Sequence, residues 1–132
     1  SFNEYEIIII GASIRYGKHS SEIAKLVKDN LEVLNNKKTA FFSVNAVARK
    51  PGKDLSYNNP YVIKFLNKTK WKPNIAAVFA GKIDYPKYKF FEKMIIRLIM
   101  FITKGPTDTS KSYEFTNWSK VDEFAAELNK KF

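Results

Sequence analysis

Three segments combine small residues, polar side chains and basic residues, a mixture suited to binding a flat polar ligand. They are GASIRYG at 11–17, SVNAVARKP at 43–51 and AGKIDYPKY at 80–88. Glycine lets the backbone approach a ligand closely, and backbone N–H groups in such turns can bond to ring oxygen and nitrogen atoms. A glycine at a strand end can also serve only to turn the chain. Because similar segments occur three times, we favour a shared binding role.

The residues before these segments are typical of buried strands. Residues 7–10 are four consecutive isoleucines, and a short β-branched run that is apolar on both faces favours a central strand. We predict a parallel sheet with strands near 6–11, 39–44 and 75–80, and a short fourth strand near 112–116. Ligands of such sheets bind at the carboxyl ends of the strands. The three segments are therefore expected to meet at one edge.

Helical patterns alternate with these strands. Ser20 or Ser21 is expected to cap a helix that runs through Leu34, and Pro60 after Asn59 opens a second helix. A third, apolar helix is expected over residues 89–104. Asn117 or Ser119 is expected to cap the last helix. The alternation predicts an α/β fold with a doubly wound parallel sheet, as one domain over residues 1–132. The polar segment 45–59 is too long for an ordinary connection, which indicates a functional or mobile loop.

Composition and charge exclude several classes of protein. The 132 residues contain no cysteine and one histidine, which excludes a disulfide framework and a Cys/His zinc site, and we predict no metal. A hydrophobic content of 45% excludes a disordered chain. The net charge of +10 and the 15% aromatic content would suit nucleic acid. Because no RNA-binding strand motif or recognition helix accompanies them, we expect no nucleic-acid partner.

Taken together with IIRLIM at 95–100 and TDT at 107–109, the three segments resemble the menaquinone-dependent protoporphyrinogen IX dehydrogenases, which are flavodoxin-like FMN enzymes of bacterial haem synthesis. The resemblance runs from Tyr5 to about Leu128 with the motifs in the same order. It implies FMN-dependent oxidation of protoporphyrinogen IX to protoporphyrin IX, with menaquinone or ubiquinone as electron acceptor. It also implies peripheral attachment to the cytoplasmic face of the inner membrane. The alternative is a flavodoxin-like electron-transfer or FMN-binding module without this substrate, although such carriers are usually acidic.

Members of that family begin with a strand, a phosphate-binding loop, a helix and a second strand. The segment that resembles their third strand here begins near residue 5, which predicts an N-terminally incomplete flavodoxin-like sheet without the βαβ phosphate-loop unit. The loop at 105–110 precedes a predicted strand, so it lacks the array of amides that a helix N-terminus offers to phosphate. We expect FMN, if it binds, to lie over 11–17 and 43–47 and to bind weakly.

The resemblance also assigns roles to individual residues. The residues expected to contact the flavin are Ser13, Ile14, Arg15, Tyr16, Gly17, Ser43, Val44 and Asn45. Two roles remain open for Tyr16. Its ring could stack on the flavin, or it could be a half-buried residue that covers the site. Arg15, Arg49 and Lys82 are expected to pair with the propionate groups of the substrate through charge-assisted hydrogen bonds. Surface solubility is the alternative role for these cations, and we favour it for Lys87.

No residue is assigned as catalytic. A flavin takes hydride itself, and the protein supplies mainly orientation and electrostatics. Asp84 is the only acidic residue in the three segments, which makes it a weak candidate for a general base. His19 has an ordinary pKa near neutrality, but we interpret it as a surface residue at the start of a helix.

The predicted helix at 89–104 has more apolar residues than one sheet face can cover. A globular amphipathic helix needs an apolar arc only a little wider than 100°. Lysines and an arginine surround the apolar positions. We expect this helix to dock on an anionic membrane surface or to mediate homo-oligomer formation. The alternative is that a longer sheet covers it.

Overall fold

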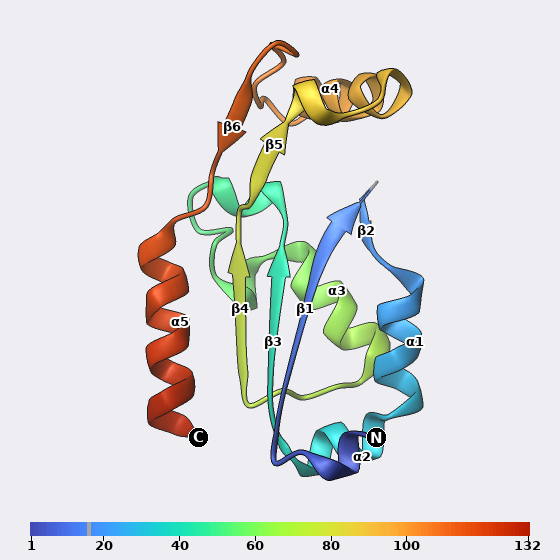
Figure 1. Cartoon of the computed structure of the whole chain (residues 1–132), viewed down its shortest axis with the longest axis vertical. Helices are drawn as coiled ribbons and strands as arrows, with labels where there is room; N and C mark the ends of the chain where they lie inside the picture. Colours follow the sequence, from blue (N-terminus) through green and yellow to red (C-terminus); the bar gives the residue numbers. More distant parts are fainter. Residues whose placement is uncertain (16) are drawn as a thin grey trace.

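A computed structural model describes residues 1–15 and 17–132 of the chain. Its main sheet has the strand order β2-β1-β3-β4 (Figure 1). The strands β1 (Ile7–Arg15), β3 (Lys38–Val44) and β4 (Ile75–Phe79) are parallel, which confirms the parallel strands predicted near 6–11, 39–44 and 75–80. The two-residue strand β2 (Lys18–His19) pairs antiparallel with the end of β1. The carboxyl ends of the parallel strands therefore share one edge.

The chain begins with a 3₁₀ turn, η1 (Phe2–Glu4). Three helices pack on one face of the main sheet: α1 (Ser21–Asp29), α2 (Leu31–Asn36) and α3 (Pro60–Thr69). The sequence predicts one helix through Leu34, whereas the structure has two, α1 and α2, which are separated at Asn30. The Asn30 side chain donates to the Leu26 carbonyl at this break. The predicted cap Ser20 and the predicted helix start at Pro60 are confirmed, and the side chains of Ser20 and Asn59 accept backbone N–H groups of the following turn. This face holds the main apolar core.

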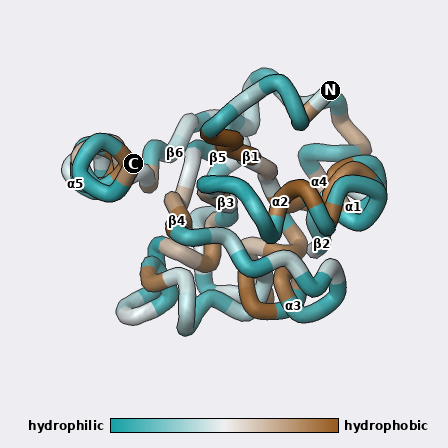
Figure 2. The backbone as a smooth tube through the Cα atoms, turned by 90° about the horizontal axis from the view of Figure 1, so that it is seen from below, coloured by the Kyte–Doolittle hydropathy of each residue, from teal (hydrophilic) through white to brown (hydrophobic). Residues whose placement is uncertain are grey.

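The last helix, α5 (Trp118–Lys131), packs on the other face of the sheet and is capped by Asn117 as predicted. Seen from below, α5 and α1 stand on opposite sides of the strands (Figure 2). Phe124 of α5 packs with Ala40 and Ile75, but α5 leaves β1 uncovered. The prediction that the isoleucine run is buried on both faces is therefore wrong. Ile8 and Ile10 are buried, whereas Ile7 and Ile9 are 42% and 47% exposed.

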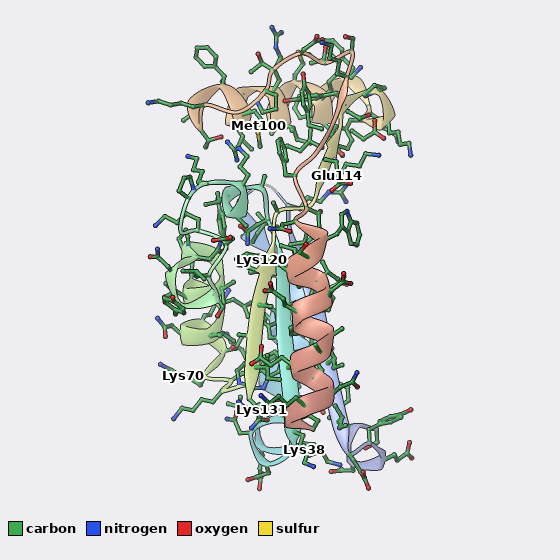
Figure 3. All side chains as sticks on the ribbon, turned by 90° about the vertical axis from the view of Figure 1, so that its left-hand side faces the viewer. Lys38, Lys70, Met100, Glu114, Lys120 and Lys131 are labelled. Atoms are coloured by element: carbon green, nitrogen blue, oxygen red, sulfur yellow. The ribbon has the colours of Figure 1, made fainter. Side chains whose placement is uncertain are left out.

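A second unit lies beyond the carboxyl edge of the main sheet. It consists of the hairpin β5 (Lys82–Asp84) and β6 (Ser112–Glu114), the turn η4 (Tyr85–Lys87) and the helix α4 (Phe90–Ile102). Figure 3 shows Met100 of α4 and Glu114 of β6 beyond the end of α5 near Lys120. The prediction that residues 112–116 join the parallel sheet is wrong. Gly81, at φ +77°, turns the chain out of β4, and β5 then pairs antiparallel with β6.

The long segment 45–59 is ordered by two short 3₁₀ turns, η2 (Ala46–Arg49) and η3 (Ser56–Asn58). Asn59 holds it against α3, because its amide nitrogen donates to the Lys53 carbonyl at 2.8 Å. Among the described residues, no helix is both long and apolar enough to cross a bilayer.

Candidate functional site

All three predicted binding segments meet in one cavity of about 290 Å³ at the carboxyl edge of the main sheet. The convergence predicted from the parallel strand order is therefore confirmed. The residues of these segments that line the cavity are Ser13, Ile14, Gly17, Val44, Asn45, Ala46, Val47, Arg49, Ala80, Lys82, Ile83 and Tyr88.

The helix α4 forms the opposite wall of this cavity. Ile96, Ile99 and Met100 give that wall an apolar surface, and Thr103 lies where the helix ends. Tyr61 contributes from the first turn of α3. The cavity thus lies between a polar sheet edge and an apolar helix, which suits a ligand with a flat ring and a few polar groups.

Arg49 joins these two walls. Its Nη1 donates to the Ala46 carbonyl at 2.7 Å, and its Nη2 donates to the Thr103 carbonyl at 3.0 Å. The guanidinium also lies 5.8 Å from the ring centre of Phe115. Burial lowers the pKa of Arg49, although interaction with Tyr85 opposes that shift. Arg49 lines the cavity, as expected of a substrate-binding cation, and it also fastens the end of α4 to the loop after β3.

Arg15 has a different position from Arg49. Its side chain is 73% exposed, and its Nη2 lies 3.4 Å from a carboxylate oxygen of Glu92 in α4. Arg15 is absent from the residues that line the cavity. It therefore ties the end of β1 to the start of α4 from outside the cavity. The predicted contact Tyr16 lies outside the described residues.

Ser43 and Asn45 belong to a buried polar network behind the cavity. Ser43 is fully buried and does not line the cavity, while Asn45 does. The Asn45 amide nitrogen donates to the Ser43 hydroxyl oxygen at 3.0 Å. Ser43 Oγ in turn lies 2.7 Å from Nε2 of His19. The side chain of Ser43 thus supports the loop from within the fold.

The prediction that His19 is a surface residue is wrong. Its ring packs edge-on against Phe65 and Phe41, with ring centres 4.9 Å and 5.8 Å away. Burial lowers its pKa from 6.5 to about 4. The two-residue strand β2 brings His19 under the sheet edge, and a strand that short leaves no periodic pattern in the sequence.

Comparison with known proteins decides the family. Residues 1–110 match the flavodoxin domain. Protoporphyrinogen IX dehydrogenase [quinone] of Escherichia coli K12 is 42% identical over 127 residues, which cover 96% of this chain and 70% of that protein. The protein of the same name from Leishmania major is 43% identical over 125 residues, covering 95% of this chain and 54% of that protein. The chain belongs to this flavodoxin-domain family. No solved structure matches it.

A flavodoxin domain implies a flavin site, and the cavity has features that suit a flat ring. Ile14, Val44 and Ile96 offer apolar surface from three different elements. Gly17 has a φ of +81°, and a Cβ atom placed there would meet none of the described residues beyond its chain neighbours within 4 Å. Those residues therefore leave the backbone at Gly17 open to a ring.

Asp84 is poorly suited to accept a proton in this flavodoxin-domain protein. The Ser112 hydroxyl donates to its Oδ1 at 2.6 Å, and Nζ of Lys87 and Lys82 lie 3.5 Å and 3.9 Å from its Oδ2. The hydrogen bond from Ser112 is the largest cause that lowers the pKa of Asp84, and the two lysine charges add to it. The carboxylate therefore stays ionised at neutral pH. Lys82 lines the cavity while pairing with this carboxylate.

Among the residues that the structure describes, no group of three or more histidine, aspartate or glutamate side chains is arranged to hold a metal ion.

The buried Tyr85 hydroxyl, which donates to the Pro106 carbonyl at 2.7 Å, supports the base of the hairpin.

Proposed function

We propose that this protein oxidises protoporphyrinogen IX to protoporphyrin IX with FMN as cofactor and passes the electrons to a quinone, menaquinone or ubiquinone, in haem biosynthesis. The observation that carries the proposal is the single cavity in which the three sequence segments meet. The names of the relatives agree with it. An electron-transfer module without this substrate is the second candidate, and the net charge of +10 disfavours it.

The residues of the cavity divide between cofactor and substrate. Ser13, Ile14 and Gly17 would hold one side of the flavin ring, and Val44 with Asn45 the other. When bound, FMN supplies the hydride acceptor for this oxidation. The apolar wall of α4 suits the pyrrole rings of a tetrapyrrole.

Charge on the cavity wall suits an anionic substrate. Arg49 and Lys82 both line the cavity, so their side chains are available to orient propionate groups by charge-assisted hydrogen bonds. Because Asp84 remains ionised beside two lysines, we assign it no proton transfer. These groups thus bind and orient the substrate without acting as acid or base.

A cavity-filling substitution tests the flavin site. We expect Ala46→Trp to weaken FMN binding at least about 10-fold, because Ala46 lines the cavity and an indole would occupy ring space. The measurement is quenching of flavin fluorescence during titration of the purified protein. Ala126→Trp is the matched control, since Ala126 is exposed on α5. Equal FMN affinity in the two variants would place the flavin elsewhere.

A coupled assay separates the two candidate functions. The FMN-loaded protein is mixed with protoporphyrinogen IX under exclusion of oxygen, and porphyrin fluorescence is followed with and without a menaquinone analogue. Quinone-dependent formation of porphyrin supports the dehydrogenase. Flavin binding without porphyrin formation supports the electron-transfer module.

We also propose that α4 attaches the protein to an anionic membrane surface, the cytoplasmic face of the inner membrane. Phe90, Phe91 and Phe101 of α4 are each about three-quarters exposed. Exposed basic residues flank them, including Lys89, Arg97 and Lys104. A second copy of the chain would bring these like charges together, whereas anionic lipid would neutralise them, so we favour lipid over a homo-oligomer.

Vesicle binding tests the role of α4. Phe90→Ser combined with Phe91→Ser should reduce co-sedimentation with anionic vesicles several-fold, and Arg97→Glu should reduce it mainly at low salt, since each basic residue adds about 1 kcal/mol near such a surface. Tyr57→Ser is the control, because Tyr57 is equally exposed but lies in η3. Wild-type sedimentation by the Phe90/Phe91 variant would rule out this docking surface.

A further inference from the structure

Four polar side chains form a continuous, buried, hydrogen-bonded network behind the cavity: His19, Ser43, Asn45 and Asn59. They come from β2, from the end of β3 and from the cap of α3. All four are at most 9% exposed. No described buried side-chain nitrogen or oxygen lacks a hydrogen-bond partner. Such a fully satisfied network holds its members in one arrangement.

Two hydrogen bonds of this network have a direction that the amide groups fix, and the third is assigned from them. Asn59 Nδ2 donates to Asn45 Oδ1 at 2.9 Å, while Asn59 Oδ1 accepts the N–H groups that cap α3. Asn45 Nδ2 donates to Ser43 Oγ. Ser43 Oγ lies 2.7 Å from His19 Nε2, and we assign the hydroxyl hydrogen of Ser43 to this contact, with Nε2 as the acceptor. This assignment makes His19 a neutral imidazole that carries its proton on Nδ1.

This hydrogen-bonded network connects two of the segments that form the sheet edge of the cavity. His19 lies two residues after Gly17, at the end of the first segment, and Asn45 lies in the second. The rings of Phe41 and Phe65 fix the imidazole on its apolar sides. Because β1 and β3 are already paired as far as Ser13 and Val44, His19 acts beyond that pairing, between the turn at 17–18 and Asn45.

We propose that His19 is a positioning residue of the flavin site, which couples the two ring-facing loops, the turn at 17–18 and the segment that begins at Asn45, through Ser43. The inference rests on the proposed function, because it assumes that these loops hold a flavin. His19 touches neither cofactor nor substrate in this role. Its hydrogen-bond acceptor at Nε2, rather than its bulk, is the property that matters.

Three variants separate the acceptor from the bulk. His19→Gln keeps an acceptor near the position of Nε2, His19→Leu keeps apolar packing without an acceptor, and Ser43→Ala removes the donor. We expect His19→Leu and Ser43→Ala to weaken FMN binding roughly 10-fold, the loss that one hydrogen bond of ordinary strength predicts. His19→Gln should stay within about 3-fold of wild type. The visible absorption spectrum of the bound flavin should change in the first two variants only.

Wild-type affinity and spectrum in His19→Leu would reduce His19 to a core residue, and equal losses in His19→Gln and His19→Leu would refute the role of the acceptor. Hydrogen exchange of the amides at 17–19 and 45–47, without flavin, gives a separate measurement. Exchange that is faster in His19→Leu than in His19→Gln supports the coupling of the loops, and equal exchange overturns it. If wild type binds no FMN, the proposed function fails while this measurement still decides the coupling.

Discussion

Replacing Arg49 with alanine should lower kcat/KM for protoporphyrinogen oxidation about 10- to 150-fold, the cost of one lost charged hydrogen bond of about 1.5–3 kcal/mol. Arg49 lines the cavity and donates to the carbonyls of Ala46 and Thr103 on its two walls. Its loss removes the cation that we propose binds the substrate, and it also removes the hydrogen bond to Thr103 at the end of α4. Arg49→Lys should rescue little, because an ammonium cannot reach both carbonyls in the geometry of the guanidinium. The measurement is steady-state kinetics on FMN-loaded protein.

Arg15→Ala is the matched control for Arg49→Ala. The Arg15 side chain is largely exposed and pairs with Glu92 at 3.4 Å, and exposed pairs of this kind contribute little. We expect a change of less than about 3-fold in kcat/KM. Flavin content should remain near wild type in both variants. A larger loss in Arg15→Ala than in Arg49→Ala would contradict the assignment of the substrate cation to Arg49.

Acidification from pH 6.5 to 4 should reduce the free energy of unfolding by up to about 3 kcal/mol through His19 alone. Burial holds the pKa of His19 at about 4 in the folded protein, while the unfolded chain has the ordinary value of 6.5. Between these values the unfolded state binds more protons, so stability falls as the pH falls. The loss begins near pH 6.5 and stops growing below pH 4.

Urea unfolding at a series of pH values measures this loss. His19→Gln removes the titrating group and should flatten the dependence between pH 6.5 and 4. Asp84, Asp108 and Glu114 also have lowered pKa values in the folded protein. When these carboxylates take up protons under more acidic conditions, the free energy of unfolding falls further. The same slope in wild type and His19→Gln would show that another group is responsible.

Much of the fold follows from local signals in the sequence. The β-branched run at 7–10 and the apolar runs before Asn45 and Gly81 predict the three parallel strands, and Asn59 and Asn117 mark the starts of their helices. The meeting of the three loops then follows from strand direction, because the parallel strands end at one edge.

Features that depend on distant residues could not be predicted in this way. His19 is buried because Phe65 and Ser43 surround it, and neither is near it in the sequence. The motifs give Arg15 and Arg49 the same role, and only the placement of α4 separates them. The strand at 112–114 has three residues, so its partner is decided by the turn at Gly81 rather than by its own pattern.

The exposed phenylalanines of α4 also affect how copies of the chain meet in solution. Phe90, Phe91 and Phe101 are each about three-quarters exposed, and exposed apolar surface of this kind favours association. Mutual repulsion between copies that each carry a charge of +10 opposes it. Because salt screens this repulsion, we expect self-association to rise with ionic strength.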